Sequence, residues 1–164
     1  MNKHEVIEKI VLERARLLDV VDRLGADAEK RAVTEEGWTA KDVLAHCIHW
    51  VGQIAFGVGA PIHPPAWVES AGNERPSGEE WNRRVVEHYK PMPLDIVRRD
   101  FEQVVDATLD KLRRRDDIDY DARANTVFPW IQSDVPVSKA IAGETWEHWP
   151  EHSAALERAI ARTA

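Results

Sequence analysis

The chain has 164 residues, 43% of them hydrophobic and 31% charged, so we expect one domain over residues 1–164 rather than a disordered tail. Its formal net charge of −7 repels phosphate backbones and anionic lipid, which argues against nucleic acid and membrane surfaces as partners. Neither a signal peptide nor a membrane span is apparent, and the single Cys47 cannot form an internal disulfide, so we expect a cytoplasmic protein.

Two amphipathic helices are predicted in the first third of the chain. The first has about six turns and ends at Gly25. Its apolar stripe consists of Ile7, Ile10, Val11, Leu17, Leu18, Val21 and Leu24. The second begins after Thr39, which suits an N-cap with Asp42 three residues on, and its apolar stretch from Val43 to Phe56 runs into glycines.

A long connection and a short helix are expected next. Prolines and a glycine over Pro61–Pro76 favour a loop. Ser77 and Glu80 then have the spacing of a second capping box, which opens a helix to about Tyr89.

The second half of the chain is predicted to hold two further long helices. Apolar residues recur at helical spacing from Leu94 to the arginines at 113–115, and 116–136 forms a second long connection. A final helix is expected from Ser138 to about Ala161, with two histidines on its inward side. These elements favour an all-α bundle with two long loops and a short extra helix.

Histidines supply the strongest chemical signal. His148 and His152 are four residues apart, so on a regular helix their imidazoles share one face at a distance suitable for binding one metal ion. A third ligand would have to come from another helix, where His46 and His49 lie three residues apart and are equivalent by spacing. The alternative is a hydrogen-bonded interior pair or a solvated face.

Two motifs about 100 residues apart resemble a known superfamily. Trp38–His46 (WTAKDVLAH) is similar to the early motif of the DinB-like superfamily, and Glu144–His152 (ETWEHWPEH) is similar to its late motif. The combination most resembles the ClbS/DfsB-like branch.

This resemblance implies an antiparallel four-helix bundle of up-down-down-up type, a homodimer, and a divalent metal, Zn²⁺ or Ni²⁺, on His46, His148 and His152. It also implies a metal-dependent hydrolase or a transferase that uses a low-molecular-weight thiol as cosubstrate. The substrate would be a small, toxic or electrophilic molecule, in a stress or detoxification role. The resemblance indicates a fold and a site more firmly than a reaction.

Pro150 falls between the two late histidines and departs from a regular helix. We expect a continuous but kinked helix, because a proline removes one backbone hydrogen bond and crowds the preceding turn. The alternative is that the helix restarts near Pro150, with His148 or Trp149 at its cap and the imidazoles diverging.

Aromatic and acidic residues near the histidines complete the predicted site. Four tryptophans are expected to wall an apolar substrate pocket: Trp50, Trp130, Trp146 and Trp149. Glu151 and Glu144 are candidates for a base or for orienting a ligand. Reading residues 148–152 as the H-x-x-E-H motif of a metalloprotease is disfavoured, because little chain follows to supply a further ligand. A function of another class is a non-catalytic protein that sequesters a small molecule in a tryptophan-lined cavity.

Overall fold

A computed structural model describes residues 1–62 and 76–162 of the chain, and the described part is built of helices without a β-strand. The helices are α1 (Lys3–Leu24), α2 (Ala40–Val58), α4 (Gly78–Tyr89), α5 (Leu94–Arg114), α6 (Val137–Glu144) and α7 (Trp149–Ala161). Short 3-10 turns, η1 (Gly25–Glu29) and η2 (Ala124–Thr126), lie in the connections. The all-α prediction is confirmed. Most of the predicted loop over 61–76 lies outside the described residues.

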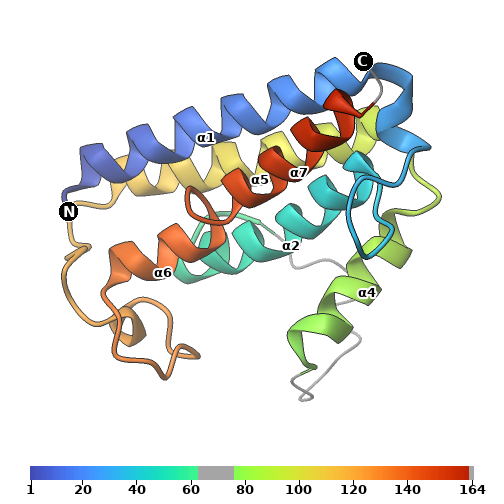
Figure 1. The fold of residues 1–164 in the computed structure, drawn as a ribbon. Coiled ribbons are helices and arrows are strands. Elements are labelled where there is room, and N and C mark those ends of the chain that lie inside the picture. The colour runs from blue at the N-terminus through green and yellow to red at the C-terminus, as the bar shows by residue number, and fades with distance from the viewer. Residues whose placement is uncertain (63–75, 163–164) are drawn as a thin grey trace.

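Four rods make the bundle: α1, α2, α5, and α6 followed by α7 (Figure 1). The chain runs along α1, returns along both α2 and α5, and runs forward again through α6 and α7, which is the expected up-down-down-up order. Helix α4 is the short extra helix and lies across one end of α2. The core between the rods is built largely from the apolar stripes that helical periodicity predicts. In α1 the prediction was wrong for Val11, which is exposed, while Val6 is buried in the core.

Ion pairs at both ends confirm the antiparallel pairing of α1 with α5. Lys3, at the start of α1, pairs with Asp116 just after α5, and Arg98, near the start of α5, pairs with Asp22 near the end of α1. Such exposed pairs add little stability individually, but they fit only one direction of packing.

Capping residues set the start of the helix that carries His46. The Thr39 side chain accepts a hydrogen bond from the Asp42 amide, and the Asp42 carboxylate accepts one from the Thr39 amide. This reciprocal box is the one predicted from the sequence. The second predicted box forms only in part: Ser77 accepts from the Glu80 amide, while the Glu80 carboxylate binds Arg83 and Arg84.

The last rod differs from the prediction of one kinked helix. Helix α6 ends at Glu144, Thr145 turns the chain with φ −135° and ψ −103°, and α7 begins at Trp149 with Pro150 in its first turn. The physical reason is that a proline in a first turn lacks only an amide hydrogen that has no helical partner there. The continuous helix was therefore wrong, and the restart near Pro150 is what the chain adopts.

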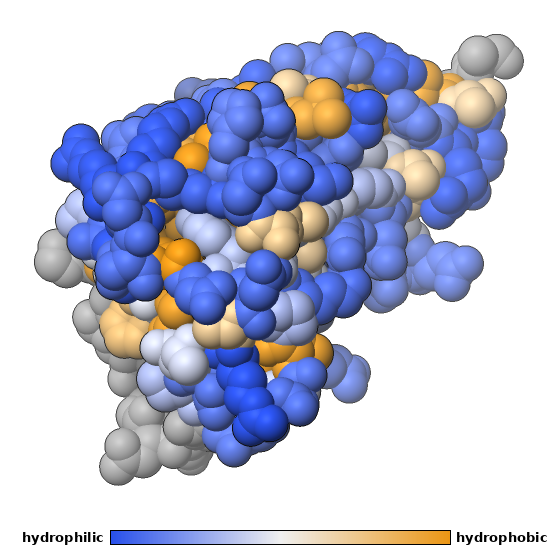
Figure 2. Space-filling view, turned by 90° about the vertical axis from the view of Figure 1, so that its left-hand side faces the viewer, coloured by the Kyte–Doolittle hydropathy of each residue, from blue (hydrophilic) through white to orange (hydrophobic). Residues whose placement is uncertain are grey.

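Among the described residues, no helix combines the length and apolar character needed to cross a membrane. Figure 2 views the end of the bundle where α1 begins, and its surface is mostly hydrophilic with small, separate apolar spots.

Candidate metal centre

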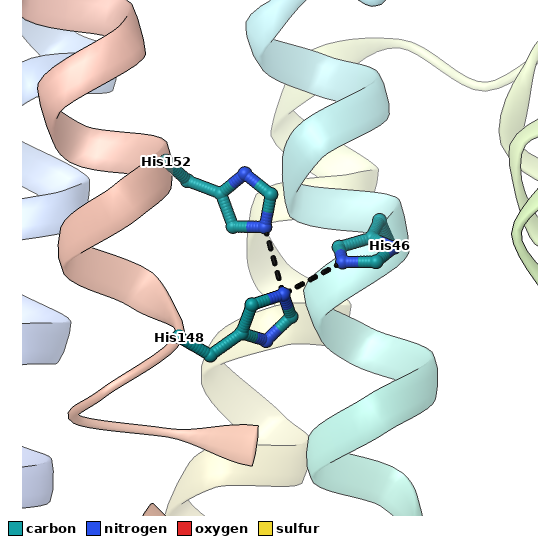
Figure 3. Close-up of side chains that lie close together, drawn as sticks. All are labelled: His46, His148 and His152. Atoms are coloured by element: carbon teal, nitrogen blue, oxygen red, sulfur yellow. Dashed lines mark hydrogen bonds between the residues drawn. The ribbon is translucent and has the colours of Figure 1, made fainter. Parts of the chain in front are cut away.

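Three imidazoles from two rods meet inside the bundle. His46 projects from α2, while His148 and His152 project from the start of α7, and all three rings point toward one another (Figure 3). The Nε2 atom of His148 lies 2.9 Å from Nε2 of His46 and 2.9 Å from Nε2 of His152. One nitrogen of each ring lies within 4.8 Å of the others.

The local backbone explains why the helix restart does not separate the late pair. His148 caps α7 but has helical dihedrals, φ −84° and ψ −50°. From His148 onward the chain therefore follows a helical path, and His148 and His152 keep the i, i+4 spacing on one face. The expectation that a restart would make these imidazoles diverge was wrong for this reason.

Burial keeps the three rings neutral near neutral pH. It lowers the pKa of His46 to about 3, with smaller contributions from His148 and His152, and lowers the pKa of His152 to about 4. Burial also lowers the pKa of His148. Neutral imidazoles carry the lone pairs that metal binding requires.

The donor set fits a metal ion better than it fits hydrogen bonding alone. A ring nitrogen carries either one hydrogen or one lone pair, so Nε2 of His148 cannot make a full hydrogen bond to both neighbours at once. Two nitrogens that bind one tetrahedral zinc at ~2.0–2.1 Å lie roughly 3.3 Å apart. The nitrogen of His148 lies 2.9 Å from each of the other two, and all three lie within 4.8 Å of one another. The residues present therefore fit a divalent cation.

The cluster forms part of the wall of a cavity of about 650 Å³. Its other walls come from the segment between η1 and α2, from Asn82 on α4, and from residues that continue the His148–His152 face along α7. Besides the three histidines, the lining includes Arg31, Thr34, Glu35, Glu36, Trp38, Asn82, Glu151, Arg158 and Arg162. A centre with three protein ligands that faces a cavity has room for a water or a substrate, as catalytic sites do.

Asn82 is a site residue that the sequence analysis missed. Its Oδ1 lies 2.8 Å from Nδ1 of His46 and accepts a hydrogen bond of 2.9 Å from the indole N–H of Trp50. Asparagine is a poor helix former, and its place inside α4 beside Trp81 is the one signal that could have drawn attention to it.

His49, the alternative third ligand, lies outside the cluster. Its ring stacks on Trp81 with centroids 5.0 Å apart, and it meets Trp50 edge-on at the same distance. Although three residues after His46, it turns toward α4 rather than α7. The structure therefore brings His46, and not His49, to His148 and His152.

The four tryptophans expected to wall the site do not line its cavity. Trp149 is fully buried and packs edge-on against Phe101, because it lies about 100° around the helix from His148. Trp130 packs on Phe56 and Phe128, near the other end of α2. Trp146 packs against the core. Trp50 meets the ring of His46 edge-on, with centroids 6.2 Å apart, and donates its indole N–H to Asn82.

The two candidate acids are separated by the structure. Glu151 lies in the cavity lining, next to the turn that holds His152. Glu144 does not line the cavity; burial raises its pKa to about 7, and its charge acts on the thiol of Cys47. Burial also raises the pKa of Cys47, so this thiol is not an activated nucleophile.

Fold and site together define a class of protein: an all-α, DinB-like bundle with a candidate three-histidine centre. Residues 11–150 match the family of mycothiol maleylpyruvate isomerase N-terminal domains, so the chain belongs to that family, which is part of the DinB-like superfamily. No curated protein and no solved structure matches the chain significantly. The superfamily prediction is confirmed, while the resemblance to the ClbS/DfsB-like branch stays a prediction.

Proposed function

We propose that this protein is a metal-dependent enzyme in which His46, His148 and His152 hold a divalent cation, Zn²⁺ or Ni²⁺. The observation that carries the proposal is the convergence of three neutral imidazoles on one point in a cavity wall. Three ligands facing a cavity of about 650 Å³ suit small-molecule chemistry, because such cavities hold substrates of ordinary size.

We propose further that the reaction uses a low-molecular-weight thiol against a small electrophile. The name of the matching family, with its mycothiol-dependent isomerase, supports a thiol over water as the nucleophile. A cation bound to the three histidines lowers the pKa of a coordinated thiol or water and so supplies a nucleophile near neutral pH. The buried, inert Cys47 supports an external thiol.

Residues around the cavity suit a polar substrate. Arg158 on α7 and Arg162 just after it line the cavity beyond His152, and Glu35 and Glu36 line it from the segment before α2. Of the two candidate acids, we assign proton transfer to Glu151, because it alone reaches the cavity. The polar lining gives no support to a tryptophan-walled cavity that sequesters an apolar molecule. A detoxification role and a homodimer stay predictions.

Metal analysis tests the centre directly. Protein purified without a histidine tag and incubated with Zn²⁺ or Ni²⁺ should hold about one ion per chain, and His148→Ala should hold less than ~0.2. His49→Ala is the control, since it removes a buried histidine that lies outside the cluster, on the helix that carries His46. Equal metal content in wild type and His148→Ala would rule out the proposed centre.

Activity separates the two nucleophiles. The metal-loaded protein should accelerate the reaction of mycothiol or another small thiol with chlorodinitrobenzene, and His148→Ala should lose this acceleration. Cleavage of p-nitrophenyl acetate without any thiol would instead support a hydrolase. Acceleration of neither reaction by loaded protein counts against an enzymatic role of this kind.

A further inference from the structure

Asn82 joins two side chains of α2 that lie one helical turn apart. Its Oδ1 is 2.8 Å from Nδ1 of His46 and 2.9 Å from Nε1 of Trp50. His46 is buried, with 5% of its surface exposed, and its Nδ1 has turned away from the cluster toward this amide. Asn82 belongs to α4, which contributes no ligand to the cluster.

The indole fixes which end of the amide faces α2. An indole N–H can only donate a hydrogen bond, so the Asn82 atom that it meets must be the oxygen. That oxygen can only accept, and Nδ1 of His46 must therefore carry a hydrogen to contact it at 2.8 Å. A neutral imidazole has one N–H, so Nε2 of His46 presents its lone pair toward His148 and His152.

We propose that Asn82 is a positioning residue that holds His46 in the metal-binding tautomer, with Trp50 locking the Asn82 amide in the required orientation. This inference rests on the proposed function, because it assigns Asn82 a role toward the same cation. It makes α4, the helix outside the four-rod bundle, a part of the centre.

Contacts independent of any metal hold α4 in place. The buried Lys41 of α2 donates from Nζ to the carbonyl oxygens of Lys90 and Met92, just beyond the end of α4. Trp81, the neighbour of Asn82, stacks on His49 of α2. Asn82 is therefore positioned before a metal arrives, and the tautomer of His46 is set in the metal-free protein.

The test begins with the tautomer in metal-free protein, read from long-range ¹H–¹⁵N NMR spectra of the histidine rings. Wild-type His46 should show a protonated Nδ1. Asn82→Leu, which fills a similar volume without an acceptor, should lose this preference, whereas Asn82→Asp should keep it. Trp50→Phe should weaken it, because the amide is then free to rotate; Trp130→Phe, which removes an indole elsewhere, should leave it unchanged.

Zn²⁺ affinity, measured by competition with a chromophoric chelator, is the second readout. Loss of a partner that orients a histidine ligand weakens binding by ~10–100-fold. We expect this loss for Asn82→Leu, near wild-type affinity for Asn82→Asp, and an intermediate effect for Trp50→Phe. Rescue by aspartate separates positioning from a merely structural role.

Two results would overturn the proposal: an unchanged His46 tautomer in Asn82→Leu, or an equal loss of affinity in the leucine and aspartate variants. If the wild-type protein binds neither Zn²⁺ nor Ni²⁺, the proposed function fails. The tautomer measurement still decides the role of Asn82 in that case, so the two failures are distinguishable.

Discussion

The histidines of the candidate centre differ from surface histidines in what burial does to their charge. A protonated ring is less stable when buried because it loses its hydration, and a second protonated ring nearby would repel it. The folded state therefore favours the neutral form. The pKa of His46 falls to about 3 and that of His152 to about 4, below the value of ~6.5 expected in an unfolded chain.

This difference predicts acid sensitivity of the metal-free protein. Below about pH 6.5 the unfolded chain binds protons at His46 and His152 that the folded chain does not. The free energy of unfolding therefore decreases as the pH is lowered. The stability that comes from the two neutral rings is fully present above that pH. It decreases as the pH is lowered toward the folded pKa values, by at most about 1.4 kcal/mol per pH unit for each ring. Urea unfolding in chelator at about pH 7 and about pH 4.5 measures it.

His46→Gln is the comparison that isolates the effect from the carboxylates. Its stability relative to wild type should improve as the pH falls across this window, because one buried proton acceptor is gone. If the difference in the free energy of unfolding between wild type and variant is the same at both pH values, the lowered pKa of His46 is contradicted.

Single residues were predicted unevenly from the sequence. His148 and His152 were found by spacing alone, whereas only the resemblance separated His46 from His49, since the two lie on nearly the same helix face. The structure separates them through the partners of α2: α7 on one side and Trp81 of α4 on the other. Asn82 was missed because a partner that lies 36 residues away is set by tertiary packing, which periodicity does not report.

At the scale of elements, starts of helices were easier to predict than the break in the last rod. Thr39 and Asp42 form a local pattern with a local cause, and the box is present. The break at Thr145 depends on a backbone conformation that no single residue announces; Thr145 is buried and donates from its hydroxyl to the carbonyl of Ile141. Pro150 indicated where α7 restarts, with His148 at its cap as the alternative prediction had it, but not the turn at Thr145 that ends α6.

Pro150 should therefore contribute to stability and little to metal affinity. In the first turn of α7 its fixed φ suits the helix, and the backbone of His148 is already helical without it. We expect Pro150→Ala to lower the free energy of unfolding by up to ~1 kcal/mol through the more flexible unfolded chain. Zn²⁺ affinity should stay within about twofold of wild type.

Urea unfolding and chelator competition measure these two quantities on the same preparation. Pro150→Gly extends the series, because glycine adds further backbone freedom at the same place and should destabilise more. A tenfold loss of affinity in Pro150→Ala would mean that the proline, and not the helical path from His148, aligns the pair.

For the whole molecule, the centre joins parts of the chain that are distant in sequence. His46 lies in the second rod and His148 and His152 in the last, and the two rods otherwise meet through buried apolar side chains. A cation held by both rods would be bound by the folded chain and released on unfolding, because the unfolded chain does not keep the three rings together.

Metal should therefore raise the thermal stability of the protein, and the size follows from mass action. At a free Zn²⁺ concentration about 100 times the dissociation constant, the folded state gains ~2.7 kcal/mol. For a domain of this size each kcal/mol raises Tm by roughly 2–4 °C, so a rise of roughly 5–11 °C is expected in calorimetry. Excess chelator should reverse it.

His46→Ala should show no rise in Tm, since His148 and His152 then belong to one rod and no longer connect it to α2. An equal rise in that variant would place the ion elsewhere on the molecule, and an unchanged Tm of the wild type at saturating Zn²⁺ would contradict binding that is linked to the fold.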